Sequence, residues 1–311
     1  MPVATSPPSS LGLHMILVVA VFVLIVAPLL LGGAGYLRAR AQAPRSPMAW
    51  DTRLTALSVL LYTLAFNMVF FLQELFLVLP KAFTPGLRPT LFHNNHAWQG
   101  EHTLAALFQG TGAVATFLLG VILLDLLRRG AGRTITTRLL LIWTAYCGVF
   151  MALPQVVVGA LSAGSDVGMA MDYFGLGAPA KTIAALLALG AIPLFARGFA
   201  RHLLGLATNP AAVASAGGRS RFIFQTATLP TLVAIVLIVP FRVPREWLEV
   251  MFLPVVVTVV GMSWIQSGAW RLRPRAAARL AAAGSLAYPL LEVVALLLVF
   301  QLLLRPGVSF F

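Results

Sequence analysis

Eight long apolar runs, almost free of charged side chains, constrain the fold of this chain more than any other feature of its sequence. A helix needs about 20 apolar residues to cross a bilayer, and most of these runs reach that length. Barrel strands are about 10 residues long and alternate in polarity, which these continuous runs do not. Only 10% of the 311 residues are charged, against about 25% in a typical soluble domain. The sequence therefore predicts an all-α, polytopic bundle of transmembrane helices.

The predicted bundle is a single integral membrane domain that covers residues 1–311. Its spans are expected at about residues 13–36, 54–79, 103–127, 139–162, 174–196, 222–241, 250–270 and 280–304. The fifth is the weakest of these, because its uncharged core, residues 182–196, contains only 15 residues. It either begins near residue 174, with Lys181 extending to the interface, or is a re-entrant segment.

Basic residues alternate between rich and poor loops along the chain. Four loops hold four arginines each, which is sixteen of the 22 Lys and Arg residues: Arg38, Arg40, Arg45, Arg53, Arg128, Arg129, Arg133, Arg138, Arg197, Arg201, Arg219, Arg221, Arg271, Arg273, Arg275 and Arg279. Loops rich in Lys and Arg face the cytoplasm, so both termini are expected outside it. The net charge of +13 then reflects contact with anionic lipid at the cytoplasmic face, with no nucleic-acid partner expected. Richness in Ala, Arg and Pro favours a bacterial inner (plasma) membrane.

The densest polar stretch, residues 93–102, precedes the third span on the side predicted to be extracytoplasmic. It contains three of the five histidines, His93, His96 and His102, and His14 near the outer end of the first span adds a fourth to this face. His93 and His96, three residues apart, would share one face of a helical turn. Together with His102 they would hold Zn²⁺ or another divalent transition metal and leave a position open for water.

The same stretch also fits an interfacial loop without a metal. Its Asn-Asn pair and Gly100 favour a turn, Trp98 suits the aromatic belt of a membrane interface, and Glu101 suits the first turn of a helix. No His-Glu-x-x-His motif is present. Both interpretations therefore stay open.

Two carboxylates are predicted to lie within the bilayer. Glu74 lies near the outer end of the second span and either pairs with the loop histidines or reaches water at the interface. Glu292 has 12 uncharged residues on each side in the eighth span, so it is expected to be protonated or paired inside the bundle. Asp166 and Asp172 follow the fourth span as loop carboxylates that can join the external cluster. Four glutamines within spans are expected to form interhelical hydrogen bonds: Gln109, Gln155, Gln225 and Gln301.

Three classes of function follow from these residues. The leading hypothesis is a membrane-embedded, metal-dependent hydrolase acting on a lipid or lipid-linked substrate at the extracytoplasmic face. His93, His96 and His102 would bind the metal, and Glu74 or Glu101 would act as general base.

Two other classes remain open. One is a proton-coupled transporter or channel in which Glu74 and Glu292 form a relay. The other is a non-catalytic subunit of a membrane complex that binds a haem or quinone through His14 and a loop histidine. The sequence contains no nucleotide-binding, haem-attachment or serine-hydrolase motif that would add a fourth.

Overall fold

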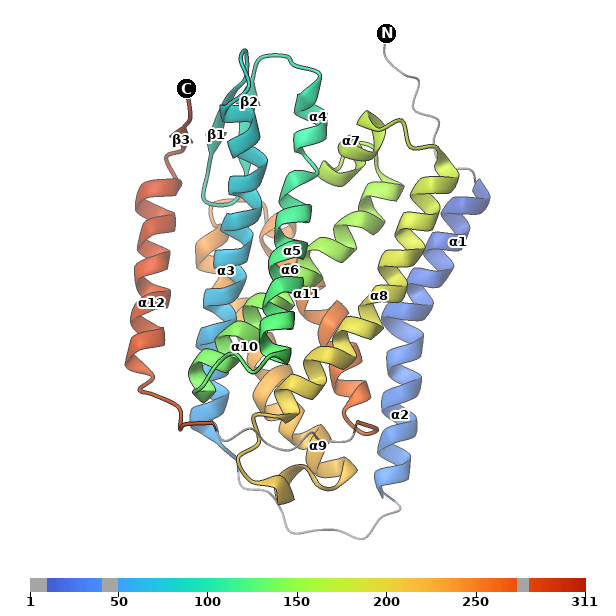
Figure 1. Cartoon of the computed structure of the whole chain (residues 1–311), viewed down its shortest axis with the longest axis vertical. Coiled ribbons are helices and arrows are strands. Elements are labelled where there is room, and N and C mark those ends of the chain that lie inside the picture. The colour runs from blue at the N-terminus through green and yellow to red at the C-terminus, as the bar shows by residue number, and fades with distance from the viewer. Residues whose placement is uncertain (1–9, 41–49, 273–279) are drawn as a thin grey trace.

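The computed structural model describes residues 10–40, 50–272 and 280–311. Within these ranges, eight helices are long and apolar enough to cross a membrane, and they pack into one bundle (Figure 1). The prediction of an integral, multi-pass helical membrane protein is confirmed at this level.

Five of the spans are single helices, and three are made of two segments each. The segments are α1 (Ser10–Val21) with α2 (Ala27–Arg40), α3 (Thr52–Ala82), α4 (Leu104–Phe108) with α5 (Thr111–Arg128), α6 (Ile135–Leu161), α8 (Ala178–Leu204), α9 (Ala216–Ile223) with α10 (Leu229–Arg242), α11 (Trp247–Gly268) and α12 (Ala287–Leu298). Wider π-helical turns, Phe22–Val26 and Phe224–Thr228, join α1 to α2 and α9 to α10, and a third extends α12 to Leu304. The first two precede Pro28 and Pro230, whose missing N–H interrupts the α-helical hydrogen-bond ladder.

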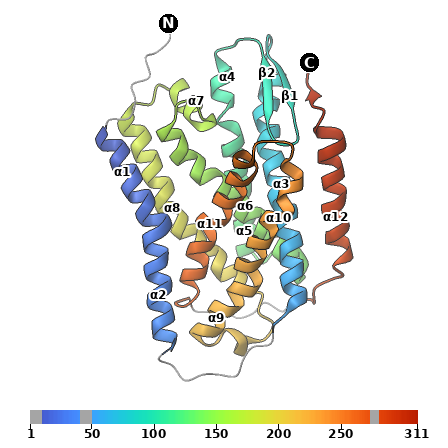
Figure 2. The same ribbon diagram turned by 180° about the vertical axis from the view of Figure 1, so that it is seen from behind.

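The centre of the bundle is built around α3 and α6, which are its most buried spans. Aromatic side chains fill the space between them, with the rings of Tyr62 and Trp143 5.2 Å apart in an edge-on contact. The Trp143 indole donates to Ser58 Oγ at 3.1 Å. The least buried spans, α1–α2 and α12, lie on opposite sides of the bundle in both views (Figures 1 and 2).

Helices α5 and α6 approach so closely that they need glycine at their contact. A Cβ atom built on Gly148 would lie 2.6 Å from the Thr116 carbonyl oxygen and 2.9 Å from the Gly120 nitrogen. Both are backbone atoms, so they cannot rotate away. Small residues at such crossings let membrane helices gain van der Waals contact along their length.

A small antiparallel sheet lies at one end of the bundle. It has the order β2-β1-β3 and consists of β1 (Arg88–Leu91), β2 (His96–Gln99) and β3 (Val308–Ser309). Leu91 pairs with His96, so a four-residue turn, 92–95, closes the hairpin. At its base Gly100 has a positive φ of 91°, and a Cβ there would meet the Gly86 carbonyl oxygen. Glycine is therefore required at this position.

The two ends of the bundle differ in composition. The sheet and the short helices α4 and α7 (Asp166–Tyr173) lie at the hairpin end, where α1 also begins (Figure 1). The opposite end contains the arginine-rich loops, and we call it the arginine-rich end. The first described helix and the last strand thus lie at the same end, as an even number of spans requires.

The fifth span starts later than predicted and is longer. Helix α8 begins at Ala178, after the separate helix α7. Lys181, in the first turn of α8, does not extend to water but forms an ion pair with Asp172 of α7. This pair neutralises a lysine that would otherwise be buried uncompensated.

The eighth span also starts later than predicted, at Ala287 instead of residue 280. Residues 280–286 are not helical and pack along the arginine-rich end. The Ala281 amide donates to the Arg133 carbonyl at 3.1 Å, and Arg53 donates to the Gly284 carbonyl at 2.8 Å. In the whole span, Ala287–Leu304, Glu292 is therefore the sixth of 18 residues and lies nearer the arginine-rich end than the hairpin end.

Candidate functional site

Helix α3 has a stripe of buried polar side chains that starts at the hairpin end and leads into the bundle. Its members are Lys81, Glu74 and Asn67, all buried. They are seven residues apart, which is close to two helical turns, so they share one face of the helix. This stripe places ionisable groups where lipid cannot reach them.

Glu74 pairs with His96, as the sequence predicts for a loop histidine. The Nδ1 atom of His96 is 2.8 Å from Glu74 Oε2, and each side chain is only 8% exposed. Side chains alternate along a strand, so His96 and Trp98 lie on the same face of β2, where their rings stack 5.9 Å apart. The hairpin thus carries the histidine onto the polar stripe of α3.

Gln109, between α4 and α5, connects the remaining polar groups. Its Oε1 accepts a hydrogen bond from Lys81 Nζ at 2.7 Å and lies 3.0 Å from His96 Nε2. Its Nε2 donates to Asp166 Oδ1 at 3.0 Å. A lysine can only donate and a carboxylate can only accept, so these two partners fix the orientation of the amide.

The fixed amide limits the forms in which His96 satisfies its neighbours. Its Nδ1 faces a Glu74 oxygen and its Nε2 faces the Gln109 oxygen, whereas a neutral imidazole has only one N–H. Two arrangements satisfy both contacts: an imidazolium that donates to both oxygens, or a protonated Glu74 that donates to Nδ1 of a neutral imidazole whose Nε2–H donates to Gln109. In the first arrangement His96 and Lys81 balance Glu74 and Asp166. These four residues and Gln109 are the polar network.

Asp166 is protonated more readily than an aspartate in water. Burial raises the pKa of Asp166, and the charge of Glu74 adds to this effect, while His96 and Lys81 oppose it. Two carboxylates in one buried network compete for the same cations. Burial in the network thus favours the protonated form of Asp166 more than water would.

Aromatic side chains lie at both ends of the polar stripe. Lys81 Nζ lies 4.6 Å from the centre of the Trp98 ring, a cation–π contact. Deeper in the bundle, the buried rings of Phe66, Tyr146 and Phe150 follow Asn67. The hydroxyl groups of the buried tyrosines at this level are bonded within the bundle, as Tyr146 is to the Val257 carbonyl at 2.8 Å. The polar stripe thus ends on a packed layer of aromatic rings.

The tip of the hairpin docks on the end of α10. Asn94 Nδ2 donates to the Arg242 carbonyl at 2.9 Å, and His93 Nε2 donates to the Val243 carbonyl at 3.1 Å. The Nδ1 atom of His93 is buried and has no hydrogen-bond partner among the described residues. Burial lowers the pKa of His93, the Val243 hydrogen bond opposes this, and Arg305, Arg245 and Arg242 lower it further. Docking of the tip therefore favours neutral His93.

Acid is expected to weaken the docking of the hairpin tip. The pKa of His93 in the folded state lies below the unfolded value of about 6.5, so the unfolded chain binds more protons in this window and stability falls as pH drops through it. Replacing His93 with glutamine, which keeps a donor for Val243, should reduce the loss of unfolding free energy between about pH 7.5 and about pH 5.5. Because a single imidazole is involved, we expect a difference of about 1 kcal/mol or less.

The measurement is thermal or denaturant unfolding in detergent at the two pH values. The exposed His102 provides the control, since His102→Gln should leave the pH dependence as in the unchanged protein. An equal pH dependence in His93→Gln and the unchanged protein would contradict the assignment.

The structure does not bring the three predicted metal ligands together. His93 faces α10, His96 has both ring nitrogens engaged in the polar network, and the exposed His102 accepts from the Leu104 amide at 3.2 Å. Over the described ranges, no group of three or more His, Cys, Asp or Glu side chains is placed to hold a metal ion. The helical turn expected for His93 and His96 is a hairpin turn, which points them in different directions.

Three further candidates lie apart from the network. Glu101 is exposed at the hairpin end. His14 is exposed on α1, which packs against α8 on the side of the bundle away from the sheet (Figure 1). Glu292 is exposed on α12, and the pairing inside the bundle that was expected for it is not found among the described residues.

Two members of the network were missed as functional residues, and one was an open alternative. Lys81 entered the sequence argument only through its charge, although its distance of seven residues from Glu74 could have revealed it. Gln109 was expected to form interhelical hydrogen bonds, which it does. Asp166 joins the external cluster, as one of the two interpretations allowed.

No protein-family model matches this chain, and no curated protein or solved structure matches it either. Its function therefore has to be argued from the polar network itself.

Proposed function

We propose that this protein is a membrane transporter that moves protons, with the polar network as its extracytoplasmic proton-binding site. The hairpin end would face outward and the arginine-rich end the cytoplasm, in a bacterial inner membrane, because arginine-rich loops are retained inside. The observation that carries the proposal is the buried Glu74–His96 pair, whose histidine lies between two oxygen acceptors.

Ionisable side chains within membrane spans are costly, and they recur in proton relays and ion pathways. The network contains two carboxylates, a lysine and a histidine in continuous hydrogen-bonded contact. Loss of one proton from His96 would leave one ring nitrogen facing an acceptor without a hydrogen. The side chains would then rearrange to remove this unfavourable contact. The network would thus have two arrangements, and their relative populations would depend on protonation.

The packed layer of aromatic rings beneath the polar stripe supports a transporter more than an open channel. A continuous water-filled path would conduct without a conformational change, whereas Asn67 is followed by buried aromatic rings. A proton at the network would reach the other side only after the helices rearrange. Such alternating access keeps proton movement coupled to a conformational step.

Proton uptake by proteoliposomes tests this proposal. Vesicles that enclose a pH-sensitive dye are given an inside-negative potassium diffusion potential, and the acidification of the lumen is recorded. We expect uptake above that of protein-free vesicles, and a loss of at least about tenfold in Glu74→Gln, which keeps the shape of the side chain but cannot release a proton. His96→Gln should behave in the same way.

Glu101→Gln is the matched control, because Glu101 is an exposed glutamate at the same end. It should keep full uptake. Equal uptake by Glu74→Gln and the unchanged protein would overturn the proposal.

The orientation of the protein in the membrane is tested separately. In a Cys147→Ser background, Gln99→Cys should react with an impermeant thiol reagent added outside cells.

A second candidate function uses the same pair in catalysis. A histidine oriented by a carboxylate is the arrangement of a general base, so the pair would serve a hydrolase that acts on a lipid or lipid-linked substrate at the extracytoplasmic face. Mass spectrometry of the lipids from the same proteoliposomes distinguishes the two. Glu74-dependent lipid cleavage without proton uptake would favour the enzyme.

A further inference from the structure

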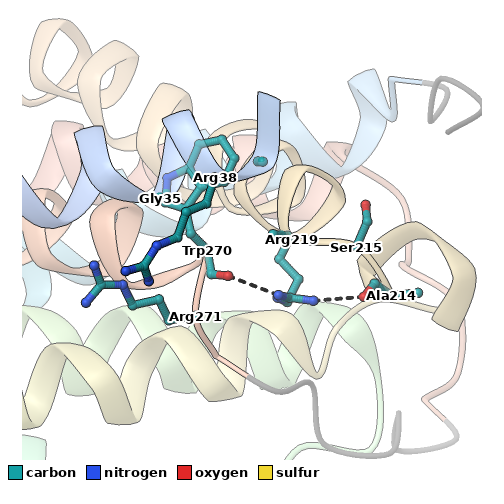
Figure 3. Close-up of a pocket in the computed structure, with 9 residues that line it drawn as sticks. Gly35, Arg38, Ala214, Ser215, Arg219, Trp270 and Arg271 are labelled. Atoms are coloured by element: carbon teal, nitrogen blue, oxygen red, sulfur yellow. Dashed lines mark hydrogen bonds between the residues drawn. The ribbon is translucent and has the colours of Figure 1, made fainter. Parts of the chain in front are cut away.

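A cavity of about 300 Å³ lies at the arginine-rich end, far from the polar network. The last turn of α2, the start of α9 and the end of α11 enclose it (Figure 3). Its polar lining consists of three arginines and one serine, Arg38, Arg219, Arg271 and Ser215. No function proposed above uses this cavity.

Arg219 is held in place by backbone carbonyls. Its guanidinium donates to Ala269 at 3.2 Å, to Trp270 at 3.0 Å and to Ala214 at 2.9 Å. These neutral partners position the group but do not balance its charge. The protein therefore keeps a partly buried positive charge fixed at the wall of the cavity.

Arg38 and Arg271 add two more positive charges. Both are exposed, and their guanidinium groups form no hydrogen bond or ion pair with the described residues. Figure 3 shows them near Trp270, together with Arg219. Like charges repel at such sites, and a shared anion would relieve the repulsion.

The sequence offers no carboxylate to supply that anion. The segments around the cavity, residues 27–40, 210–223 and 265–272, contain no Asp or Glu. Residues 41–49 and 273–279, which follow two of these segments in the sequence, contain none either. None of these segments therefore supplies a counter-charge for the three arginines.

The cavity has two further features that suit an anion at a membrane surface. Ser215 is the N-cap of α9, so the positive end of that helix faces the cavity. Trp270 contacts the Tyr36 ring edge-on at 6.3 Å, and such aromatic residues gather at the level of lipid headgroups. Gly35 permits this contact, since a Cβ there would lie 2.4 Å from Trp270 Cγ.

We propose that this cavity binds the phosphate group of a phosphate ester, with Arg38 and Arg271 as its direct ligands and Arg219 and the start of α9 as its fixed positive wall. Guanidinium groups match phosphate oxygens in geometry and charge. The phosphate has two sources, the headgroup of an anionic phospholipid or a soluble phosphate compound. Basic cavities between helices at the cytoplasmic face are suited to the first.

Native mass spectrometry of the detergent-purified full-length protein tests the proposal. Arg38→Gln/Arg271→Gln is compared with Arg128→Gln/Arg133→Gln, which removes two exposed arginines from the same end but outside the cavity. Each protein is incubated with phosphatidylglycerol or with phosphatidylcholine, and bound lipid is counted. A parallel thermal-shift series uses inorganic phosphate.

Each double variant loses two positive charges at the same end of the bundle, so both lose the same general attraction to anions. A difference in lipid binding between them therefore measures the contribution of the cavity. We expect the unchanged protein and the control pair to retain phosphatidylglycerol over phosphatidylcholine, and the cavity pair to bind it at least about tenfold more weakly, because charge-assisted hydrogen bonds are lost. Stabilisation of the first two proteins by inorganic phosphate alone would assign the site to a soluble phosphate compound.

Equal binding of phosphatidylglycerol and equal stabilisation by phosphate in the cavity pair and the control pair would overturn the proposal. The melting temperature of each protein without ligand shows whether it is folded. Since Arg38 and Arg271 are exposed, the cavity pair should melt like the unchanged protein.

Discussion

Replacing Glu74 with leucine is expected to lower the free energy of unfolding by about 3–5 kcal/mol, because it removes one partner from a buried ion pair. His96 and Lys81 would remain buried with only Asp166 to balance them. The measurement is equilibrium unfolding in mixed detergent micelles. Glu101→Leu, at an exposed position, should change stability by no more than about 0.5 kcal/mol.

A second substitution at His96 tests whether the loss comes from the unpaired charge. When both partners of a buried pair are replaced by apolar side chains, most of the stability returns, because no charge is left without a partner. The Glu74→Leu/His96→Leu variant should therefore be more stable than Glu74→Leu alone. Losses that simply add would show that the two residues do not act as a pair.

The contact between α5 and α6 carries the second large effect. Replacing Gly148 with alanine should destabilise the protein by about 1–3 kcal/mol, because the added methyl group would meet backbone atoms of α5 and push the helices apart. A Cβ atom at this position would lie 2.6 Å from the Thr116 carbonyl oxygen. Unfolding in detergent again measures the loss.

The chain provides a matched control for this glycine. Gly190 lies in α8, and a Cβ there would meet nothing within 4 Å. Because alanine forms helices better than glycine by up to about 1 kcal/mol, Gly190→Ala should keep or raise stability. The same chemical change is thus expected to have opposite signs at the two positions, and equal effects would contradict the close helix contact.

The spans could be predicted because the bilayer imposes their length. The fourth was expected at residues 139–162, and α6 runs from Ile135 to Leu161. The errors occur where apolar residues do not enter a membrane helix. Residues 280–286 are apolar, but they pack against the loop before α6. Hydropathy cannot distinguish an apolar segment that crosses the bilayer from one that packs against a loop. The eighth span was therefore predicted to start too early, which placed Glu292 at its middle.

The hairpin could not be predicted, because each strand has only four residues. Strands this short show no clear alternation of polarity. The partners of β1 and of the hairpin tip also lie far along the chain, at Ser309 and Val243. A pairing of Glu74 with one of the loop histidines could be predicted, because a carboxylate inside a membrane span needs a partner. Which histidine it would be could not be predicted, because strand β2 orients His96 toward Glu74.

The position of the hairpin also imposes an order on biosynthesis. Helix α3 reaches the bilayer with Glu74 and Lys81 before the segments that hold His96, Gln109 and Asp166 can pack against it. The hairpin that delivers His96 is anchored by Val243 and extended by β3, which follow later still. During insertion by the translocon, α3 must therefore cross the membrane with its charges unpaired or protonated. The sheet that carries His96 becomes complete only after β3, the last strand, has been made.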